Sequence, residues 1–347
     1  MNLLSLLRPR RSKNTTTTPA EVYYGLDHAL LNIPLPPPSM WMNLGYWEDT
    51  NDFPTACAAL LNQVLITAGL LDEDGIGRKI EEDKKVNLVD VGIGCGDQSV
   101  RCLGYRRANI GDNEGDGGEK KPLFDSYVGI TSLPVQARFA KERVDSLLPS
   151  SEKGEERRAQ IFCTNAAIPS SWPDDLKSSL PITPLKNTTT TPDLNSAEPK
   201  EETWLLALDT LYHFTPSRLP LFTYAHDMLQ SNIMTFDLLL PTPKPSLWNR
   251  LLLRLLCFLG GIPYSNFLSE DEYKSLLASA GYDVDKIKLR DISAHVFPGI
   301  SSFLKSRIEE GRMFGLGKMG KFKGAKRLFS WWATSGAVRG VVVVARC

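Results

Sequence analysis

A glycine-rich turn directly after an apolar run is the segment of this chain best suited to bind a ligand through its backbone. Asp90 lies near the end of the run, and Gly92, Gly94 and Gly96 follow at alternate positions before a polar helix start. Glycine lets the backbone turn sharply and approach a ligand closely, and a helix N-terminus offers N–H groups to a carboxylate. The GxGxG spacing differs from the GxGxxG of dinucleotide sites. A glycine turn without a ligand is the structural alternative.

A second group of reactive side chains ends another apolar run, in the segment LDTLYHF. Asp209 and His213 are expected at the carboxyl edge of a parallel sheet, where open α/β sheets bind their ligands. Imidazole exchanges protons near neutral pH, so His213 is a candidate general base, with Tyr212 as the second candidate. A purely structural hydrogen-bonding role for His213 stays open.

The elements that must position these residues follow from the alternation of short apolar runs with helix-like segments, a pattern typical of α/β folds. Ser269 and Glu272 have the spacing of a capping box, and Gly281 ends the helix that they begin. We predict a Rossmann-like, doubly wound seven-strand sheet with an antiparallel last strand. The strands are expected at 86–92, 126–131, 159–165, 203–209, 231–240, 285–292 and 339–346, with crossover helices at 98–107, 134–148 and 217–230.

One domain is expected over residues 21–347, after a tail or targeting segment over 1–20. Residues 21–71 are expected to form an N-terminal helical cap ahead of the sheet, and 241–268 a lid-like insertion. Polar, turn-rich composition predicts surface insertions at 109–122 and 177–202.

The charge balance and the cysteines restrict the class of protein. Forty basic and forty acidic side chains leave no net charge to attract a polyanion, so a nucleic-acid partner is not expected. The six cysteines are scattered and contain no CxxC pair, which argues against a disulfide framework and against a metal site. A reducing compartment, and hence a cytoplasmic location, fits this pattern best.

The first residues contain four leucines followed by three arginines, and no acidic residue before Glu21. The charges follow the apolar part, which is not the order of a secretory signal. A disordered tail is the simplest interpretation, and a mitochondrial presequence is the alternative.

An unusually apolar helix is expected at 247–262, within the lid-like insertion. Its longest apolar stretch is interrupted by Arg254 and is shorter than the about 20 residues that span a bilayer, so no transmembrane segment is expected. Three interpretations stay open: a helix packed on the core, a lid over a lipid-like acceptor, or a peripheral contact with an anionic membrane. The leucine-rich stripe comprises Trp248, Leu251, Leu252, Leu255, Leu256 and Leu259, with Arg250 and Arg254 on the other side.

The segment VDVGIGCG resembles motif I of class I S-adenosylmethionine-dependent methyltransferases, and the resemblance extends over about 41–346. It implies S-adenosylmethionine as the cofactor. In that family the glycines pack against the methionine and sugar part of the cofactor. The strand-end carboxylate helps to hold its amino-acid end. By motif position these roles fall on Gly92, Gly94, Gly96 and Asp90.

The next two strand ends depart from the common family pattern. Thr131 stands where many members have an acidic residue that binds the ribose, and Thr131 with Gln136 resembles the GhTxxxxQ segment of cyclopropane-fatty-acid-synthase-like members. That resemblance implies ribose contacts from both side chains; a solvated helix start is the alternative. Asn165 and Ala166 resemble the adenine-recognising segment, with Asn165 in place of an acid, and a simple strand-end turn is the alternative.

Two further parts of the resemblance concern the cap and the reaction side. Tyr46 and Trp47 resemble the GYW of cyclopropane-synthase and sterol-type members that closes over the cofactor, and aromatic faces suit a sulfonium cation. Packing between cap and sheet explains these rings equally well. The segment around Asp209 and His213 resembles phosphobase and other small-molecule methyltransferases, in which a histidine here can take part in proton removal.

These residues together predict transfer of a methyl group to a small, partly apolar molecule by in-line displacement. A nucleotide-dependent oxidoreductase is disfavoured by the glycine spacing and by the missing ribose carboxylate. A non-catalytic cofactor-binding partner or scaffold of the same fold stays the alternative outside enzymes, because fold and cofactor site do not prove turnover.

Overall fold

The computed structural model describes residues 34–81, 83–108, 121–148, 158–182, 201–315 and 319–347. The expected tail over 1–20 lies outside the described residues, as do most of the expected insertions 109–122 and 177–202. Where those insertions are described, residues 177–179 belong to a helix and 201–202 to a strand.

A seven-stranded sheet organises the chain, in the order β5-β4-β2-β6-β7-β9-β8. All pairs from β5 to β7 are parallel, and β9 runs antiparallel between β7 and β8. The predicted doubly wound sheet with an antiparallel last strand is therefore confirmed. The strands are β2 (Lys85–Val91), β4 (Ser126–Thr131), β5 (Ala159–Cys163), β6 (Glu201–Leu208), β7 (Asn232–Leu239), β8 (Ile287–Asp291) and β9 (Arg339–Ala345).

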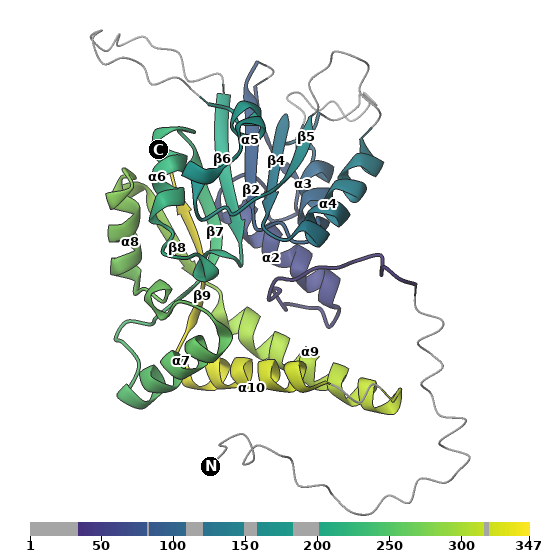
Figure 1. Ribbon diagram of the computed structural model, residues 1–347, viewed down its shortest axis with the longest axis vertical. Coiled ribbons are helices and arrows are strands. Elements are labelled where there is room, and N and C mark those ends of the chain that lie inside the picture. The colour runs from purple at the N-terminus through teal and green to yellow at the C-terminus, as the bar shows by residue number, and fades with distance from the viewer. Residues whose placement is uncertain (1–33, 82, 109–120, 149–157, 183–200, 316–318) are drawn as a thin grey trace, which may run out of the picture.

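Helices cover both faces of the sheet, as parallel crossovers require (Figure 1). One face carries α2, α3 and α4, and the other carries α5, α6 and α8. The capping box of Ser269 and Glu272 at the start of α8 is confirmed. The bounds are α2 (Phe53–Thr67), α3 (Asp97–Gly104), α4 (Pro134–Leu147), α5 (Asp174–Ser179), α6 (Leu219–Asp227) and α8 (Glu270–Ser279).

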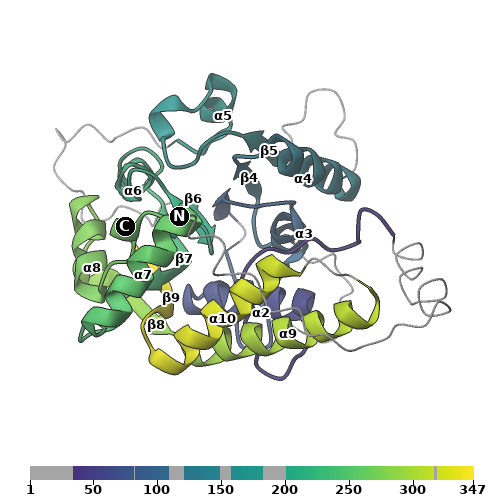
Figure 2. The same ribbon diagram turned by 60° about the horizontal axis from the view of Figure 1, so that its bottom comes forward.

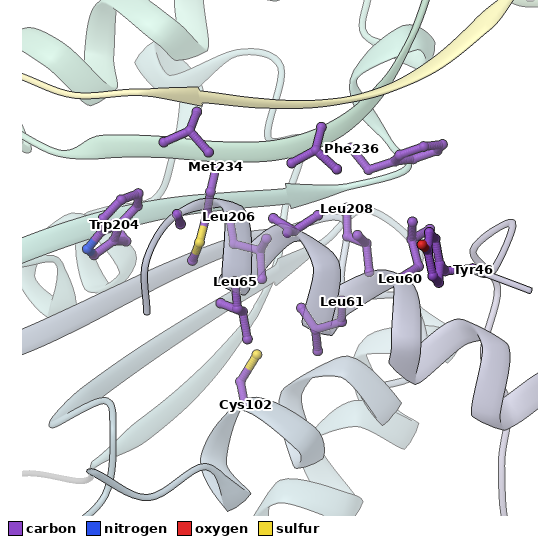
Figure 3. Packing of buried hydrophobic residues seen from close by; sticks show 14 of the residues in the cluster. Tyr46, Leu60, Leu61, Leu65, Cys102, Trp204, Leu206, Leu208, Met234 and Phe236 are labelled. Atoms are coloured by element: carbon purple, nitrogen blue, oxygen red, sulfur yellow. The ribbon is translucent and has the colours of Figure 1, made fainter. Parts of the chain in front are cut away.

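The expected cap contains two different structures. Residues 34–52, hereafter the strap, have no helix or strand and reach the carboxyl edge of the sheet. The α2 helix packs on the sheet itself, where Leu61 and Leu65 meet Leu206 and Met234 in a buried cluster (Figure 3). Burying this many apolar side chains removes their surface from water, which is the main favourable contribution to folding.

A helical hairpin between β8 and β9 has no counterpart in the sequence prediction. It consists of α9 (Ser293–Met313) and α10 (Gly320–Ser335), and lies with α7 (Leu247–Gly260) at one end of the sheet (Figures 1 and 2). Among the described residues no helix is both long and apolar enough to cross a membrane. Smaller elements are a two-stranded sheet of β1 (Gly77–Lys79) and β3 (Arg107–Ala108), and the 3-10 helices η3 (Pro169–Ser171), η4 (Leu211–His213), η5 (Tyr264–Asn266) and η6 (Val284–Lys286).

Candidate functional site

A cavity of about 460 Å³ opens at the carboxyl edge of the sheet. Its walls come from the glycine turn after β2, from the ends of β4, β5 and β6, and from the strap at 40–43. This is where parallel α/β sheets place ligands, because the strand ends and the helix N-termini converge there. Of the residues singled out in the sequence, the cavity is lined by Gly92, Gly94, Thr131, Gln136, Asn165, Ala166, Asp209, Tyr212 and His213.

The three glycines of the turn have different neighbours. A Cβ on Gly92 would lie 2.5 Å from Thr210 Oγ1, and one on Gly96 would lie 2.6 Å from the Cα of Ala140 on α4. Packing inside the protein therefore accounts for both positions. Gly94, at φ +55°, faces the cavity, and its nearest neighbour would be Met42 Sδ at 3.5 Å. Gly94 is thus the position where the backbone is open to a ligand.

Asp90 is fully buried and does not line the cavity. Gln98 Nε2 donates to Asp90 Oδ1 at 2.6 Å, and Tyr127 Oη lies 2.7 Å from Asp90 Oδ2. Burial raises the pKa of Asp90 to about 7, and these two hydrogen bonds oppose the rise. Both carboxyl oxygens thus have protein partners, so Asp90 fixes the strand end and the start of α3.

Thr131 and Gln136 lie side by side at the end of β4 and the start of α4. Thr131 Oγ1 donates to Gln136 Oε1 at 3.0 Å, and Gln136 Nε2 lies 3.4 Å from the sulfur of Met42 on the strap. Both side chains line the cavity. The Thr131 hydroxyl and the Gln136 amide can exchange their mutual hydrogen bond for hydrogen bonds to the two hydroxyl groups of a diol.

Asn165 and Ala166 form a turn beyond the end of β5. Asn165 Oδ1 accepts from the backbone N–H of Ala167 at 2.9 Å, and its own carbonyl accepts from Trp172 Nε1 at 3.0 Å. The side-chain oxygen is therefore already engaged in a local turn, although a carbonyl oxygen has a second lone pair. The turn fixes Ala166 at the cavity wall.

Asp209 combines an unusual backbone with an incompletely paired carboxyl group. Its φ is +56°, a left-handed conformation that is uncommon for a residue other than glycine and is often found at functional sites. Oδ2 accepts from the backbone N–H of Leu44 at 2.9 Å, and the Tyr212 hydroxyl also hydrogen-bonds to this carboxyl group, although buried Oδ1 has no partner of regular geometry. Burial raises the pKa of Asp209 to about 8, since it disfavours the charged carboxylate.

The η4 turn brings Tyr212 and His213 to the cavity, with ring centroids 4.3 Å apart. His213 is exposed to solvent, and partial desolvation lowers its pKa, against an opposing effect of Asp237. A histidine with a lowered pKa is neutral at pH 7 and can accept a proton. Burial raises the pKa of Tyr212 well above its usual value, so Tyr212 stays protonated.

A buried polar network beneath η4 was not identified from the sequence. Asn266 Nδ2 donates to the carbonyls of Tyr212 at 3.0 Å and Phe214 at 2.7 Å. The carbonyl of Asn266 in turn accepts from Arg218 Nη1 at 2.6 Å, and Arg218 forms a buried ion pair with Asp237 at 2.8 Å. This network fixes the backbone that carries His213. The sequence contained one indication of this network, because Asp237 is a charged residue within an otherwise apolar strand.

An ion pair that fixes the strap was also missed. Arg143 Nη1 on α4 lies 2.7 Å from Asp97 Oδ1, and the Asp97 carboxylate accepts from the backbone N–H of Met40 at 3.1 Å. Arg143 Nη2 also donates to the carbonyl of Pro38 at 3.3 Å. The strap residues that follow, 40–43, form one wall of the cavity.

Tyr46 and Trp47 lie outside the cavity. Tyr46 is buried beside Leu60 at the end of the α2 cluster (Figure 3), and its ring stacks on His295 with centroids 4.8 Å apart. Trp47 packs on Gly299 of α9, where no side chain would fit, and its Nε1 donates to the carbonyl of Leu44 at 2.8 Å. These rings join the strap to α9.

The fold is shared with known enzymes, although no protein-family model and no curated protein matches the sequence. The mycolic acid cyclopropane synthase CmaA1 complexed with SAH and CTAB superposes with a TM-score of 0.56 and 13% identity, over 93% of this chain and 95% of that chain. The cyclopropane synthase MmaA2 from Mycobacterium tuberculosis gives 0.54 and 13%, over 88% and 90%.

The chain has the class I methyltransferase fold. The fold implied by the VDVGIGCG segment is thereby confirmed. The [4+2]-cyclase SpnF superposes on the same fold, with a TM-score of 0.50 and 16% identity over 94% of this chain and 95% of that chain. Since one of these neighbours is described as a cyclase, the reaction must be argued from the cavity.

Proposed function

We propose that this protein is an S-adenosylmethionine-dependent methyltransferase that acts on a small, partly apolar molecule. The observation that carries the proposal is the cavity at the carboxyl edge of the sheet, which is lined both by Asp209, whose Oδ1 has no hydrogen-bond partner of regular geometry, and by the open backbone at Gly94. A buried carboxyl oxygen without a partner is costly unless a ligand supplies one. The ammonium group of S-adenosylmethionine would donate a hydrogen bond to this carboxyl group.

The other cavity residues fit the remaining parts of this cofactor. Thr131 and Gln136 would bind the ribose hydroxyls, after exchanging their mutual hydrogen bond for contacts with the ligand. Asn165 and Ala166 would lie at the adenine, where the backbone N–H of Ala166 is the proposed donor. Gly92, Gly96 and Asp90 would act indirectly, since packing and buried hydrogen bonds engage them.

When bound, the cofactor would supply a methyl group on an already activated leaving group. The work left to the protein is to align an acceptor atom and to exclude water. His213 is placed to remove a proton from an acceptor hydroxyl or amine, because its ring is neutral at pH 7 and it lines the cavity. Tyr212, with its raised pKa, would donate a hydrogen bond and not act as a base.

The test is isothermal titration of the full chain with S-adenosylmethionine and with S-adenosylhomocysteine, followed by a product assay on a panel of small amphiphilic alcohols, amines and alkenes. Binding of both ligands together with a methylated product would support the proposal. Absence of binding by the folded protein would overturn it. Binding without any methylated product would instead favour the scaffold interpretation.

A further inference from the structure

One face of α7 is apolar and exposed to solvent. Trp248 is 82% exposed and Phe258 is 81% exposed, and the other side chains of this face are also large and apolar. Positions three and four residues apart lie on the same side of a helix, so these residues form one continuous strip. We call this strip the α7 face; it comprises Leu247, Trp248, Leu251, Leu252, Leu255, Phe258 and Leu259.

The side of α7 that packs on the protein is a different one. Leu253 and Cys257 are buried and belong to the cluster that also contains Trp332 of α10. Ser246 caps the start of the helix by accepting from the backbone N–H of Asn249 at 3.3 Å, and Gly261 ends it in a left-handed conformation. The helix therefore has defined ends and a defined attachment, and it presents its leucines outward. The core-packed interpretation of the leucine stripe is wrong for these exposed positions.

The charged side chains of α7 itself and of α10 are basic, although the chain as a whole has equal numbers of basic and acidic side chains. The neighbouring α9 contributes a mixture, with Arg307 paired to Glu310. Figure 2, in which this side comes forward, shows α7, α10 and α9 on the same side of the molecule. The basic residues of α7 and α10 are Arg250, Arg254, Lys321, Lys323, Lys326 and Arg327.

The basic charge and the exposed apolar side chains of this surface together favour one kind of binding partner. A second copy of the chain, packed face to face, would bring the same basic side chains against each other, which is unfavourable. The leading segment 1–33 is basic in its first part as well, with arginines at positions 8, 10 and 11. An anionic lipid surface instead pairs with the basic residues and accepts apolar side chains at the depth of its headgroups.

We infer that α7 and α10 together form a docking surface for an anionic lipid bilayer, with the α7 face inserted at the headgroup level and the basic side chains on the surface phosphates. Exposed Trp248 suits such an interface, because indole has an apolar body and a polar N–H. Phe322 of α10 is a further exposed apolar side chain on this surface.

The docking surface is structurally continuous with the cavity. The helix α7 leads directly into η5, where Asn266 holds the backbone of Tyr212 and Phe214 at the cavity wall. The docking surface is thus joined through η5 to the segment that carries His213. The docking itself does not depend on the proposed methyl transfer, and its test needs neither cofactor nor turnover.

The test is co-sedimentation of the full chain with vesicles of phosphatidylcholine mixed with phosphatidylserine, and with vesicles of phosphatidylcholine alone. Binding is expected only with the anionic vesicles, and it should weaken with added salt. Two double variants probe the surface, W248S with L255S and K321E with R327E. Since each basic residue contributes about 1 kcal/mol near an anionic surface, the charge reversal should weaken binding at least about tenfold.

Matched controls change the same kinds of side chain elsewhere. Val284→Ser alters an exposed apolar side chain in η6, next to the start of β8, and Lys141→Glu reverses an exposed charge on α4. Both controls should bind as the parent does. Equal binding by parent and surface variants, or no binding to anionic vesicles, would overturn the inference. A dimer in sedimentation velocity that Trp248→Ser dissociates would also overturn it and assign the α7 face to a second copy.

Discussion

The carboxylate of Asp209 accepts a hydrogen bond from the backbone N–H of Leu44 at 2.9 Å and thereby ties the end of β6 to the strap, 165 positions earlier in the chain. The contact uses Oδ2, the Tyr212 hydroxyl hydrogen-bonds to the same carboxyl group, and Asp209 lines the cavity. The strap is therefore part of the site, and its position and the charge of Asp209 should respond together to a bound cation.

Replacing Asp209 with Asn should stabilise the free protein at neutral pH. The pKa of Asp209 is about 8 in the folded protein, whereas an unfolded aspartate titrates near 3.9. The contribution of the protonated carboxyl group to the free energy of unfolding is therefore complete below about pH 4 and is lost as the pH rises through about 8. Asparagine tolerates the left-handed backbone and never ionises. Thermal unfolding should show a gain of about 1 kcal/mol or more at pH 8 and little gain at pH 4.

The same variant should bind S-adenosylmethionine less well. A cationic ligand favours the ionised carboxylate, so the affinity of the parent should increase with pH up to about 8, where the ligand's own ammonium group begins to lose its proton. In D209N this pH dependence should disappear. Titration calorimetry in buffers of different ionisation enthalpy measures the proton release directly, and an unchanged pH profile in the variant would remove Asp209 from the ligand site.

Gly94→Asp should abolish cofactor binding while the fold persists. Aspartate is among the residues that tolerate the left-handed region, and the space at Gly94 is open, so the backbone is not expected to rearrange. The new side chain would fill the cavity where the ligand must approach. Isothermal titration is the measurement, with circular dichroism as the check of folding and Gly104→Asp, at a position with open surroundings on α3, as the control. Unchanged affinity in folded G94D would refute the proposed cofactor position.

Replacing His213 with Ala should lower turnover about 100-fold, the usual scale for loss of a general base, with cofactor affinity nearly unchanged. His226→Ala is the matched control, because His226 pairs with Asp227 on α6 and does not line the cavity. Parent activity should be constant at neutral pH and decrease in acid, since the pKa of His213 lies below its ordinary value. A variant within threefold of the parent would reduce His213 to a structural role.

Arg143→Ala should loosen the strap and weaken cofactor binding by about tenfold, because a hydrogen bond to a charged group contributes about 1.5 kcal/mol or more. Arg138→Ala on the same helix is the control, since its pair with Glu142 is exposed. Equal affinities of the two variants would show that the ion pair with Asp97 does not shape the cavity.

The central strands β2, β4, β6, β7 and β9 were predictable because each is a short apolar run buried on both faces, and the topology then places residues such as Thr131 and Asp209 at one edge. The hairpin of α9 and α10 was not predictable in the same way, because Pro298 and Gly299 interrupt the helical pattern near the start of α9. Contacts that join distant positions, such as Asn266 with Tyr212, have no local pattern in the sequence.

The position of β9 has a consequence for how the chain folds during synthesis. Among the described strands β8 pairs only with β9, and β9 is made after both α9 and α10. Until β9 leaves the ribosome, the nascent chain presents β7 as an open sheet edge and β8 without a neighbour, a state prone to mispairing with other chains. Completion of the sheet is thus the last topological event, and a premature stop before Arg339 should yield an aggregating product despite an intact sequence around the cavity.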